Sequence, residues 1–363
     1  MFQLDKIIRR NILSLVPYSS ARSEYSSGDA ILLDANENPF NHPYNRYPDP
    51  LQRTLKKGIA EMLGIDTCQL FLGNGSDEAI DLLYRAFCEP SRQNVITMDP
   101  SYGMFEVCAR INDVALKKIP LTDRFQADTA RIQQAVDTST RLIFFCSPNN
   151  PTGNLLDRGS IIRIAEKFNG LVVVDEAYID FADTESLITS IVKLPNLVIL
   201  RTFSKAWGMA GVRLGMAIAD ERIITVLNKI KYPYNIGMLT QQLVAEMLEK
   251  KDQRDQWVAT IKNEKRKLTE SLLKLALVEK IFPSDANFIL VRFSNHLAVM
   301  RFLVDEKIIL RNRSNMYLCE GCLRITIGTE QENEMLIRKL KQFEQMNPSS
   351  VENWIIRNKE KRP

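Results

Sequence analysis

The stretch Leu171-Val172-Val173-Val174-Asp175-Glu176-Ala177-Tyr178 joins an apolar run to a polar segment, and the same pattern recurs where Leu197-Val198-Ile199-Leu200 precedes Thr202-Phe203-Ser204-Lys205. Short continuous runs of Val, Ile, Leu and Phe are typical of strands that are buried on both faces, as in a parallel sheet. Further runs of this kind lie at 69–72, 94–98, 142–146 and 216–219. With amphipathic helical stretches between them, they predict an α/β fold with a mainly parallel sheet.

The length of 363 residues favours two domains, because a single core rarely organises more than about 300 residues. From about residue 240 to 277 the pattern becomes that of a long helical region. A smaller α+β unit follows, with strand-like segments at 287–293, 308–311 and 322–327 and helix-like segments at 297–306 and 331–345. We therefore expect an N-terminal arm at 1–28, a large domain at 29–250, a small C-terminal domain at 251–346 and a tail at 347–363.

Composition and charge exclude several classes of function. Hydrophobic residues make up 45% of the chain, and the net charge is only +4, which predicts no basic face for nucleic acid. No apolar run approaches the ~18 residues of a membrane span, and the N-terminus mixes charged with apolar residues, so we expect a cytoplasmic protein. Of the six cysteines only Cys319 and Cys322 have a C-x-x-C spacing, and the two histidines are far from them, so we expect no metal site.

Polar segments follow most of the predicted strands. Ligands of open α/β sheets bind beyond the carboxyl ends of the strands, so these segments are where chemistry is expected. Each of them alone has a plain explanation as a turn, a helix cap, a loop or a surface lysine. They are residues 73–78, 99–103, 147–153, 175–178 and 202–215.

Taken together and in this order, the segments resemble the fold-type-I aminotransferases that depend on pyridoxal 5′-phosphate (PLP), over nearly the whole chain. The most specific marker is Lys205 in Ser204-Lys205-Ala206-Trp207-Gly208, thirty residues after Asp175. The resemblance implies a large domain with a mainly parallel seven-stranded sheet, a smaller α+β domain and PLP as cofactor.

The resemblance also implies roles for the residues near the cofactor ring. Lys205 would carry PLP as a Schiff base and move the proton between the substrate Cα and the cofactor C4′. Asp175 would pair with the pyridine nitrogen and keep it protonated. Tyr178 and Asn149 would form hydrogen bonds with the ring oxygen O3′, and Tyr102 would stack on the ring.

The cofactor phosphate would be held by a helix start and by nearby polar side chains. Ser76, Asp77 and Glu78 would offer backbone amides, which a helix N-terminus presents to anions. Other donors to the phosphate would be the hydroxyls of Thr202 and Ser204 and the guanidinium of Arg213. The resemblance further implies that Tyr47 reaches the phosphate of a neighbouring subunit, which predicts a homodimer with shared active sites.

Finer motifs are similar to those of one subgroup, the histidinol-phosphate aminotransferases. They lie at 16–22, 33–39, 46–48, 309–311 and 322–329. The resemblance implies amino transfer between histidinol phosphate and 2-oxoglutarate, giving glutamate, in histidine biosynthesis. Arg324 would hold either the phosphate or the carboxylate, with Arg311 in support and with Tyr18 and Asn36 near the substrate. Arg311 could instead be a structural ion-pair partner.

Two alternatives remain open, and a third is disfavoured. An aromatic amino acid aminotransferase and a threonine-phosphate decarboxylase of cobalamin synthesis share the fold and most of the motifs. A PLP-binding transcription regulator is disfavoured, because only about 32 residues precede Leu33 and the lysine and aspartate of the cofactor site are intact.

Overall fold

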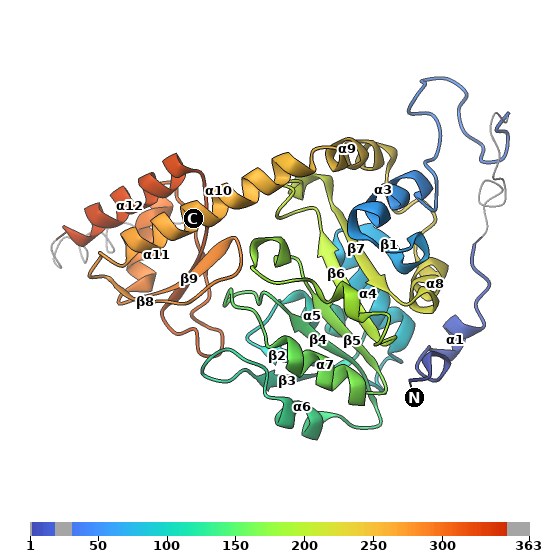
Figure 1. The fold of residues 1–363 in the computed structure, drawn as a ribbon, viewed down its shortest axis with the longest axis horizontal. Coiled ribbons are helices and arrows are strands. Elements are labelled where there is room, and N and C mark those ends of the chain that lie inside the picture. Colours follow the sequence, from blue (N-terminus) through green and yellow to red (C-terminus); the bar gives the residue numbers. More distant parts are fainter. Residues whose placement is uncertain (1, 19–30, 347–363) are drawn as a thin grey trace, which may run out of the picture.

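The computed structural model describes residues 2–18 and 31–346, and all structural statements below concern those residues. They form two sheets, one of seven strands and one of four, and Figure 1 shows the small sheet, with β8 and β9, beside the large one. None of the described helices combines the length and the apolar composition needed to cross a membrane.

The large sheet has the strand order β1-β7-β6-β5-β4-β2-β3. The neighbours from β6 to β3 pair in parallel, whereas β7 pairs antiparallel with both β1 and β6. This confirms the predicted mainly parallel seven-stranded sheet. Its strands are β1 (Leu70–Asn74), β2 (Asn94–Asp99), β3 (Ala115–Pro120), β4 (Thr140–Cys146), β5 (Leu171–Asp175), β6 (Leu197–Thr202) and β7 (Leu214–Ala219).

The edge strand β3 lies outside the six predicted runs. It contains Lys117 and Lys118, and most of its residues are at least partly exposed. Lysines on an edge strand discourage pairing with further chains, so such a strand has no continuous apolar run by which it could be recognised.

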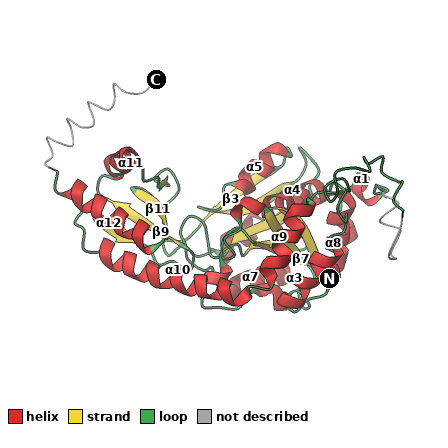
Figure 2. Cartoon of the chain, turned by 90° about the horizontal axis from the view of Figure 1, so that it is seen from above, coloured by secondary structure: helices red, strands yellow, loops and turns green. Residues whose placement is uncertain are grey.

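Alternate side chains of the large sheet pack into two separate cores. In β5, Val172 and Val174 lie in one core, and Leu171 and Val173 lie in the other. Helices cover both faces, as Figure 2 shows, so each strand is buried on both sides. One face is covered by α3 (Arg53–Leu63), α6 (Thr129–Ala135), α7 (Arg158–Lys167) and α9 (Met238–Leu248), and the other by α4 (Ser76–Phe87), α5 (Met104–Ile111) and α8 (Glu221–Ile230).

The small sheet is antiparallel, with the strand order β10-β11-β9-β8. Its strands are β8 (Val278–Ile281), β9 (Phe288–Phe293), β10 (Arg311–Asn312) and β11 (Cys322–Thr326). Ile289, Val291, Leu323 and Ile325 face a core built with α10 (Lys251–Leu272), α11 (His296–Asp305) and α12 (Glu330–Glu344). The opposite face carries Leu290 and Cys322, which belong to a core of the large sheet.

The predicted long helical region is two helices, α9 and α10, separated by residues 249–250. Figure 1 shows α10 running from beside α9 to the small sheet, so this helix connects the two parts of the molecule. The two sheets fall within 29–250 and 251–346, and the exact domain boundaries stay a prediction. The predicted tail, 347–363, lies outside the described residues. Shorter elements are α1 (Arg10–Leu13), η1 (Leu4–Lys6), η2 (Thr67–Gln69), η3 (Ile179–Phe181), η4 (Leu187–Ser190) and η5 (Ala210–Val212).

Candidate active site

A cavity of about 120 Å³ lies where β1, β4, β5 and β6 end. Ligand sites are expected at this edge of an open α/β sheet. Most of the residues predicted to bind the cofactor line this cavity: Ser76, Asp77, Tyr102, Asp175, Tyr178, Thr202, Ser204, Lys205 and Arg213. Segments far apart in the sequence therefore meet as predicted.

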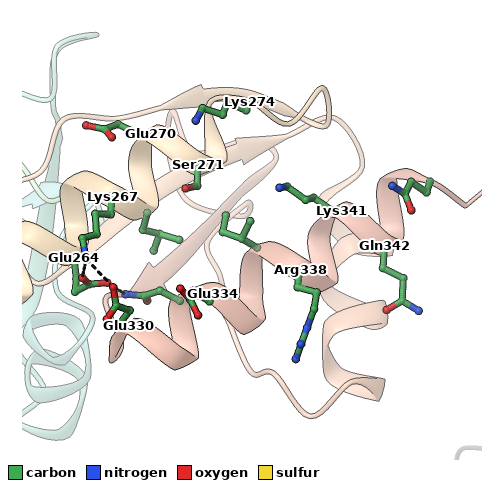
Figure 3. Close-up of a pocket in the computed structure, with 14 residues that line it drawn as sticks. Glu264, Lys267, Glu270, Ser271, Lys274, Glu330, Glu334, Arg338, Lys341 and Gln342 are labelled. Atoms are coloured by element: carbon green, nitrogen blue, oxygen red, sulfur yellow. Dashed lines mark hydrogen bonds and ion pairs between the residues drawn. The ribbon is translucent and has the colours of Figure 1, made fainter.

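Size alone does not mark this cavity as the site. A groove of about 710 Å³ runs between α10 and α12 on the small domain, and Figure 3 shows its charged lining. The Lys267 amine there lies 2.9 Å from a Glu264 carboxylate oxygen and 2.8 Å from one of Glu330. Lys267 and Glu330 are exposed, whereas Glu264 is buried. Because these charges already neutralise one another, the groove is better explained as the surface between two helices than as a ligand site.

Lys205 is held by a tight loop after β6. Phe203 and Trp207 are buried in the core of the large sheet on either side of it, and the Phe203 amide donates to the Leu214 carbonyl at 3.0 Å. The Lys205 amine lies 5.6 Å from the ring centroid of Tyr178. Burial and the positive charge of Arg324 lower its pKa, which increases the fraction of neutral, nucleophilic amine.

Asp175 ends β5 and is 3% exposed. Its carboxylate accepts a hydrogen bond from the Ala177 amide at 3.0 Å, and no described lysine or arginine forms an ion pair with it. Burial therefore raises its pKa to about 7. A buried carboxylate without a cation is costly, so a ligand with a protonated ring nitrogen fits this position. The side chains that line the cavity therefore fit PLP.

The start of α4 forms a cradle suited to a phosphate. Gly75 precedes the helix with φ 74°, and its amide donates to the Arg213 carbonyl at 2.7 Å. The free amides of the first helical turn and the guanidinium of Arg213 both favour an anion. The Ser204 amide donates to the Thr202 hydroxyl at 3.1 Å, which keeps both hydroxyls beside this cradle.

Gly215 lets β7 approach the helix start closely. A Cβ at this position would lie 2.1 Å from the Ser76 nitrogen and 2.4 Å from the Gly75 carbonyl carbon. Gly215→Ala should therefore displace the cradle, lower PLP affinity by at least about tenfold and cost roughly 1–3 kcal/mol of stability. Titration with PLP and thermal unfolding measure the two effects.

Gly211→Ala is the matched control, because a Cβ there would meet no atom within 4 Å. It should bind PLP as the wild type does. Equal PLP affinity in the two variants would contradict the role given to Gly215.

Tyr102 lines the cavity from the loop before α5. Its hydroxyl donates to Asp77 Oδ1 at 3.0 Å, and its ring packs edge-on against Phe105 with 5.7 Å between centroids. Burial and the Asp77 carboxylate raise the pKa of its hydroxyl, so it stays neutral. Asp77 Oδ2 also lies 3.8 Å from the Arg213 guanidinium, so its carboxylate contacts both side chains.

Asn149, which is predicted to contact the ring oxygen, lies outside the cavity lining. Asn149 is fully buried. Its side-chain amide donates to the Pro100 carbonyl at 3.0 Å and to the Thr152 hydroxyl at 2.7 Å, so it braces two loops. The next residue, Asn150, lines the cavity instead. The sequence alone offers no signal that distinguishes these adjacent asparagines.

Glu78 and Tyr47 also lie outside the cavity lining. The Glu78 carboxylate accepts hydrogen bonds from the Asn74 amide and from the side chain of Asn235, so it is used within the scaffold. Tyr47 is 51% exposed and stacks on Tyr234 with 4.5 Å between ring centroids. Its predicted contact with a neighbouring subunit stays a prediction.

Among the residues predicted to bind substrate, Arg324 lies nearest the cavity. Its guanidinium donates to Asn150 Oδ1 at 2.6 Å and lies 5.2 Å from the ring centroid of Phe288. Burial lowers its pKa. Arg311 is its direct partner across β10 and β11. Tyr18 and Asn36 are exposed and outside the cavity lining, so their roles stay predictions.

Comparisons with known proteins agree with this geometry. A family model described as aminotransferase class I and II matches residues 24–340. A histidinol-phosphate aminotransferase of Bacteroides fragilis is 52% identical over 345 residues, covering 95% of this chain and 100% of the relative.

Solved structures share the fold. A histidinol-phosphate aminotransferase from Clostridium acetobutylicum matches with a TM-score of 0.76 and 26% identity, over 83% of this chain and 91% of that one. One from Sinorhizobium meliloti, solved in complex with pyridoxal-5′-phosphate, matches with a TM-score of 0.75 and 23% identity, over 85% of this chain and 84% of that one. The chain belongs to the class I and II aminotransferases, a family of PLP-dependent enzymes.

Proposed function

We propose that this chain transfers the amino group between L-histidinol phosphate and 2-oxoglutarate, giving imidazole acetol phosphate and L-glutamate in histidine biosynthesis. The observation that carries the proposal is the position of Arg324, which contacts Asn150 at the edge of the Lys205 cavity and lies opposite Arg311. The 52% identity to the Bacteroides fragilis enzyme over its full length supports the same substrates.

PLP, when bound, supplies an electron sink for the electrons left on the substrate Cα when its proton departs. Lys205 would hold the cofactor and, once released by the substrate amine, would accept and return the Cα proton. Its lowered pKa suits both tasks, because a neutral amine is both a nucleophile and a base. Asp175 would be ionised by the positive ring nitrogen and hold it in place.

Arg324 and Arg311 would serve two anions in turn. Histidinol phosphate carries a phosphomethyl group where an ordinary amino acid carries its α-carboxylate. One anion-binding place must therefore accept either group, and a planar guanidinium can form paired hydrogen bonds with both. Tyr18 and Asn36 would complete the substrate end of the site.

The alternatives are an aromatic aminotransferase and a threonine-phosphate decarboxylase, and a substrate panel separates them. The PLP-loaded protein is given 2-oxoglutarate with histidinol phosphate or phenylalanine, and O-phosphothreonine alone. We expect glutamate to form fastest with histidinol phosphate and no carbon dioxide from phosphothreonine. Faster glutamate formation with phenylalanine, or release of carbon dioxide, would refute the proposal.

We also propose a homodimer, because the N-terminal region exposes a series of large apolar side chains. Figure 1 shows the described segments on both sides of residues 19–30 lying outside the large domain. Such exposure is typical of surfaces that a partner covers. The exposed fractions are 85% for Val16, 74% for Tyr18, 91% for Ile31, 88% for Leu33 and 76% for Phe40. Light scattering should give twice the chain mass of 41.6 kDa, and a monomer at micromolar concentration would contradict this.

A cytoplasmic location belongs to the same proposal. All six cysteines are free, and five of them are buried. Unpaired thiols are typical of proteins kept in a reducing compartment.

A further inference from the structure

Three arginines at the β10–β11 edge of the small sheet share the face that is turned toward the large domain. Arg311 and Arg324 are directly opposite each other on β10 and β11. The pairing continues beyond β10, because the Arg313 amide donates to the Cys322 carbonyl at 3.0 Å. Side chains two residues apart on an extended chain point to the same side. Arg313 therefore lies on the same face as Arg311, Arg324 and Cys322.

This face borders the Lys205 cavity. Cys322 packs in the core of the large sheet, and Arg324 contacts Asn150, which lines the cavity. The positive charge of Arg313 is close enough to Tyr178, also of the cavity lining, to affect the ionisation of its hydroxyl. Arg313 is thus a third cation at the same edge of the site, although it is absent from the motif set that points to Arg311 and Arg324.

The three guanidinium groups have no counter-ion within the described part of the chain. None of them forms an ion pair there, and the buried Nε atoms of Arg313 and Arg324 have no hydrogen-bond partner. Burial, followed by the charges of Arg324 and Arg311, lowers the pKa of Arg313 to about 10. Neighbouring positive charges that repel one another and have no counter-ion favour binding of a polyvalent anion.

The two proposed substrates present different anions to the three guanidinium groups: a phosphate and a carboxylate. A phosphate monoester carries a charge of about −1.5 to −2 at pH 7 and offers three acceptor oxygens. A carboxylate carries one charge and two oxygens, which a single guanidinium fork can satisfy. A third guanidinium therefore adds more to the binding of a phosphate than to that of a carboxylate.

We propose that Arg313 is a specificity-determining residue that, together with Arg311 and Arg324, selects the phosphate of the amino donor over the α-carboxylate of the second substrate. This inference rests on the proposed function.

The first test compares R313Q with the wild type in steady-state kinetics. Loss of one charge-assisted contact should lower kcat/KM for histidinol phosphate roughly 10- to 100-fold, while kcat/KM for 2-oxoglutarate changes less than about threefold. R313K keeps the charge without the fork and should fall between R313Q and the wild type. Equal losses for both substrates would overturn the inference, because a merely structural role would affect both alike.

The matched control is R292Q, which removes a charge from the same face. Arg292 is the direct partner of Cys322 on β9. It donates to the Leu318 carbonyl at 3.2 Å and lies 3.9 Å from Glu320, so its charge is already partnered. R292Q should leave the ratio of the two kcat/KM values unchanged.

A second readout needs no turnover. Inorganic phosphate should raise the thermal unfolding temperature of the PLP-loaded wild type and of R292Q, and R313Q should need at least about tenfold more phosphate for the same shift. Unchanged phosphate dependence in R313Q would also overturn the inference. If the wild type fails to use histidinol phosphate, the proposed function fails, whereas the phosphate titration still decides the role of Arg313.

Discussion

Lys205→Ala should lower the rate of amino transfer by at least about 10⁴-fold, because it removes both the nucleophile that holds the cofactor and the base that moves the Cα proton. The variant should also lose the absorbance of lysine-bound PLP. Steady-state glutamate formation and a spectrum of the PLP-loaded variant measure the two effects.

The variant should still fold. Burial lowers the pKa of Lys205, which means that its charged form is destabilised in the folded protein. Removing it should therefore leave the unfolding temperature of the cofactor-free protein unchanged or slightly higher. Lys205→Arg, which keeps a charge but cannot form a Schiff base, should be as inactive as Lys205→Ala. Retention of a tenth of the activity by either variant would contradict the role of Lys205.

Asp175→Asn should lower the rate roughly 100- to 5,000-fold, because breaking a buried ion pair costs about 3–5 kcal/mol. The shape of the side chain is kept, and its oxygen can still accept from the Ala177 amide. The effect should therefore come from the lost charge opposite the ring nitrogen. Turnover and PLP affinity should both fall, and Asp175→Glu should recover part of the affinity.

Asp175→Asn should have the opposite effect on the cofactor-free protein. Burial raises the pKa of the carboxyl from its usual value of 3.8 to about 7 in the folded state. Between these values the folded state holds a proton that the unfolded state lacks, so stability falls as the pH rises from about 4 to about 7. D175N has no carboxyl group at this position, so it should not lose stability in this way. Without PLP it should unfold at a higher temperature than the wild type at pH 7.5 and at the same temperature near pH 4.

Thermal unfolding with and without PLP at the two pH values separates these effects. If D175N stabilised the PLP-loaded and the cofactor-free protein equally, the Asp175 carboxylate would have no partner on the cofactor. That result would contradict the role given to Asp175.

The interior of the fold could be predicted from the sequence because buried parallel strands are continuous apolar runs. Leu171–Asp175 is such a strand and is buried along its whole length. The edge strands β3 and β8 could not be predicted in this way, since Lys118 and Lys280 occupy exposed positions and Lys117 a partly exposed one. Partial exposure removes the apolar signal on which the prediction depends.

The site was predictable where a strand end fixes the position of a side chain. Asp175 is the last residue of β5 and Lys205 lies three residues after the end of β6, so their place at the carboxyl edge of the sheet follows from the strands themselves. Asn149 and Asn150 lie in a loop, where the direction of each side chain depends on its hydrogen bonds. Only the structure shows that Asn149 donates to Pro100 and Thr152 while Asn150 faces Arg324.

The role proposed for Arg313 could not be predicted from the sequence either. Its importance depends on a register that joins β10 to β11, and on the fact that none of the three arginines forms an ion pair in the described part of the chain. Neither property can be read from the local sequence, because pairing partners and counter-ions come from distant segments.

A single-turnover reaction tests the central claim most directly. The PLP-loaded protein is mixed with histidinol phosphate in the absence of any keto acid, and the absorbance of the lysine-bound cofactor is followed. We predict a fast loss of that absorbance, with one imidazole acetol phosphate formed per site and no carbon dioxide. No loss with histidinol phosphate, together with complete loss with phenylalanine, would contradict the account.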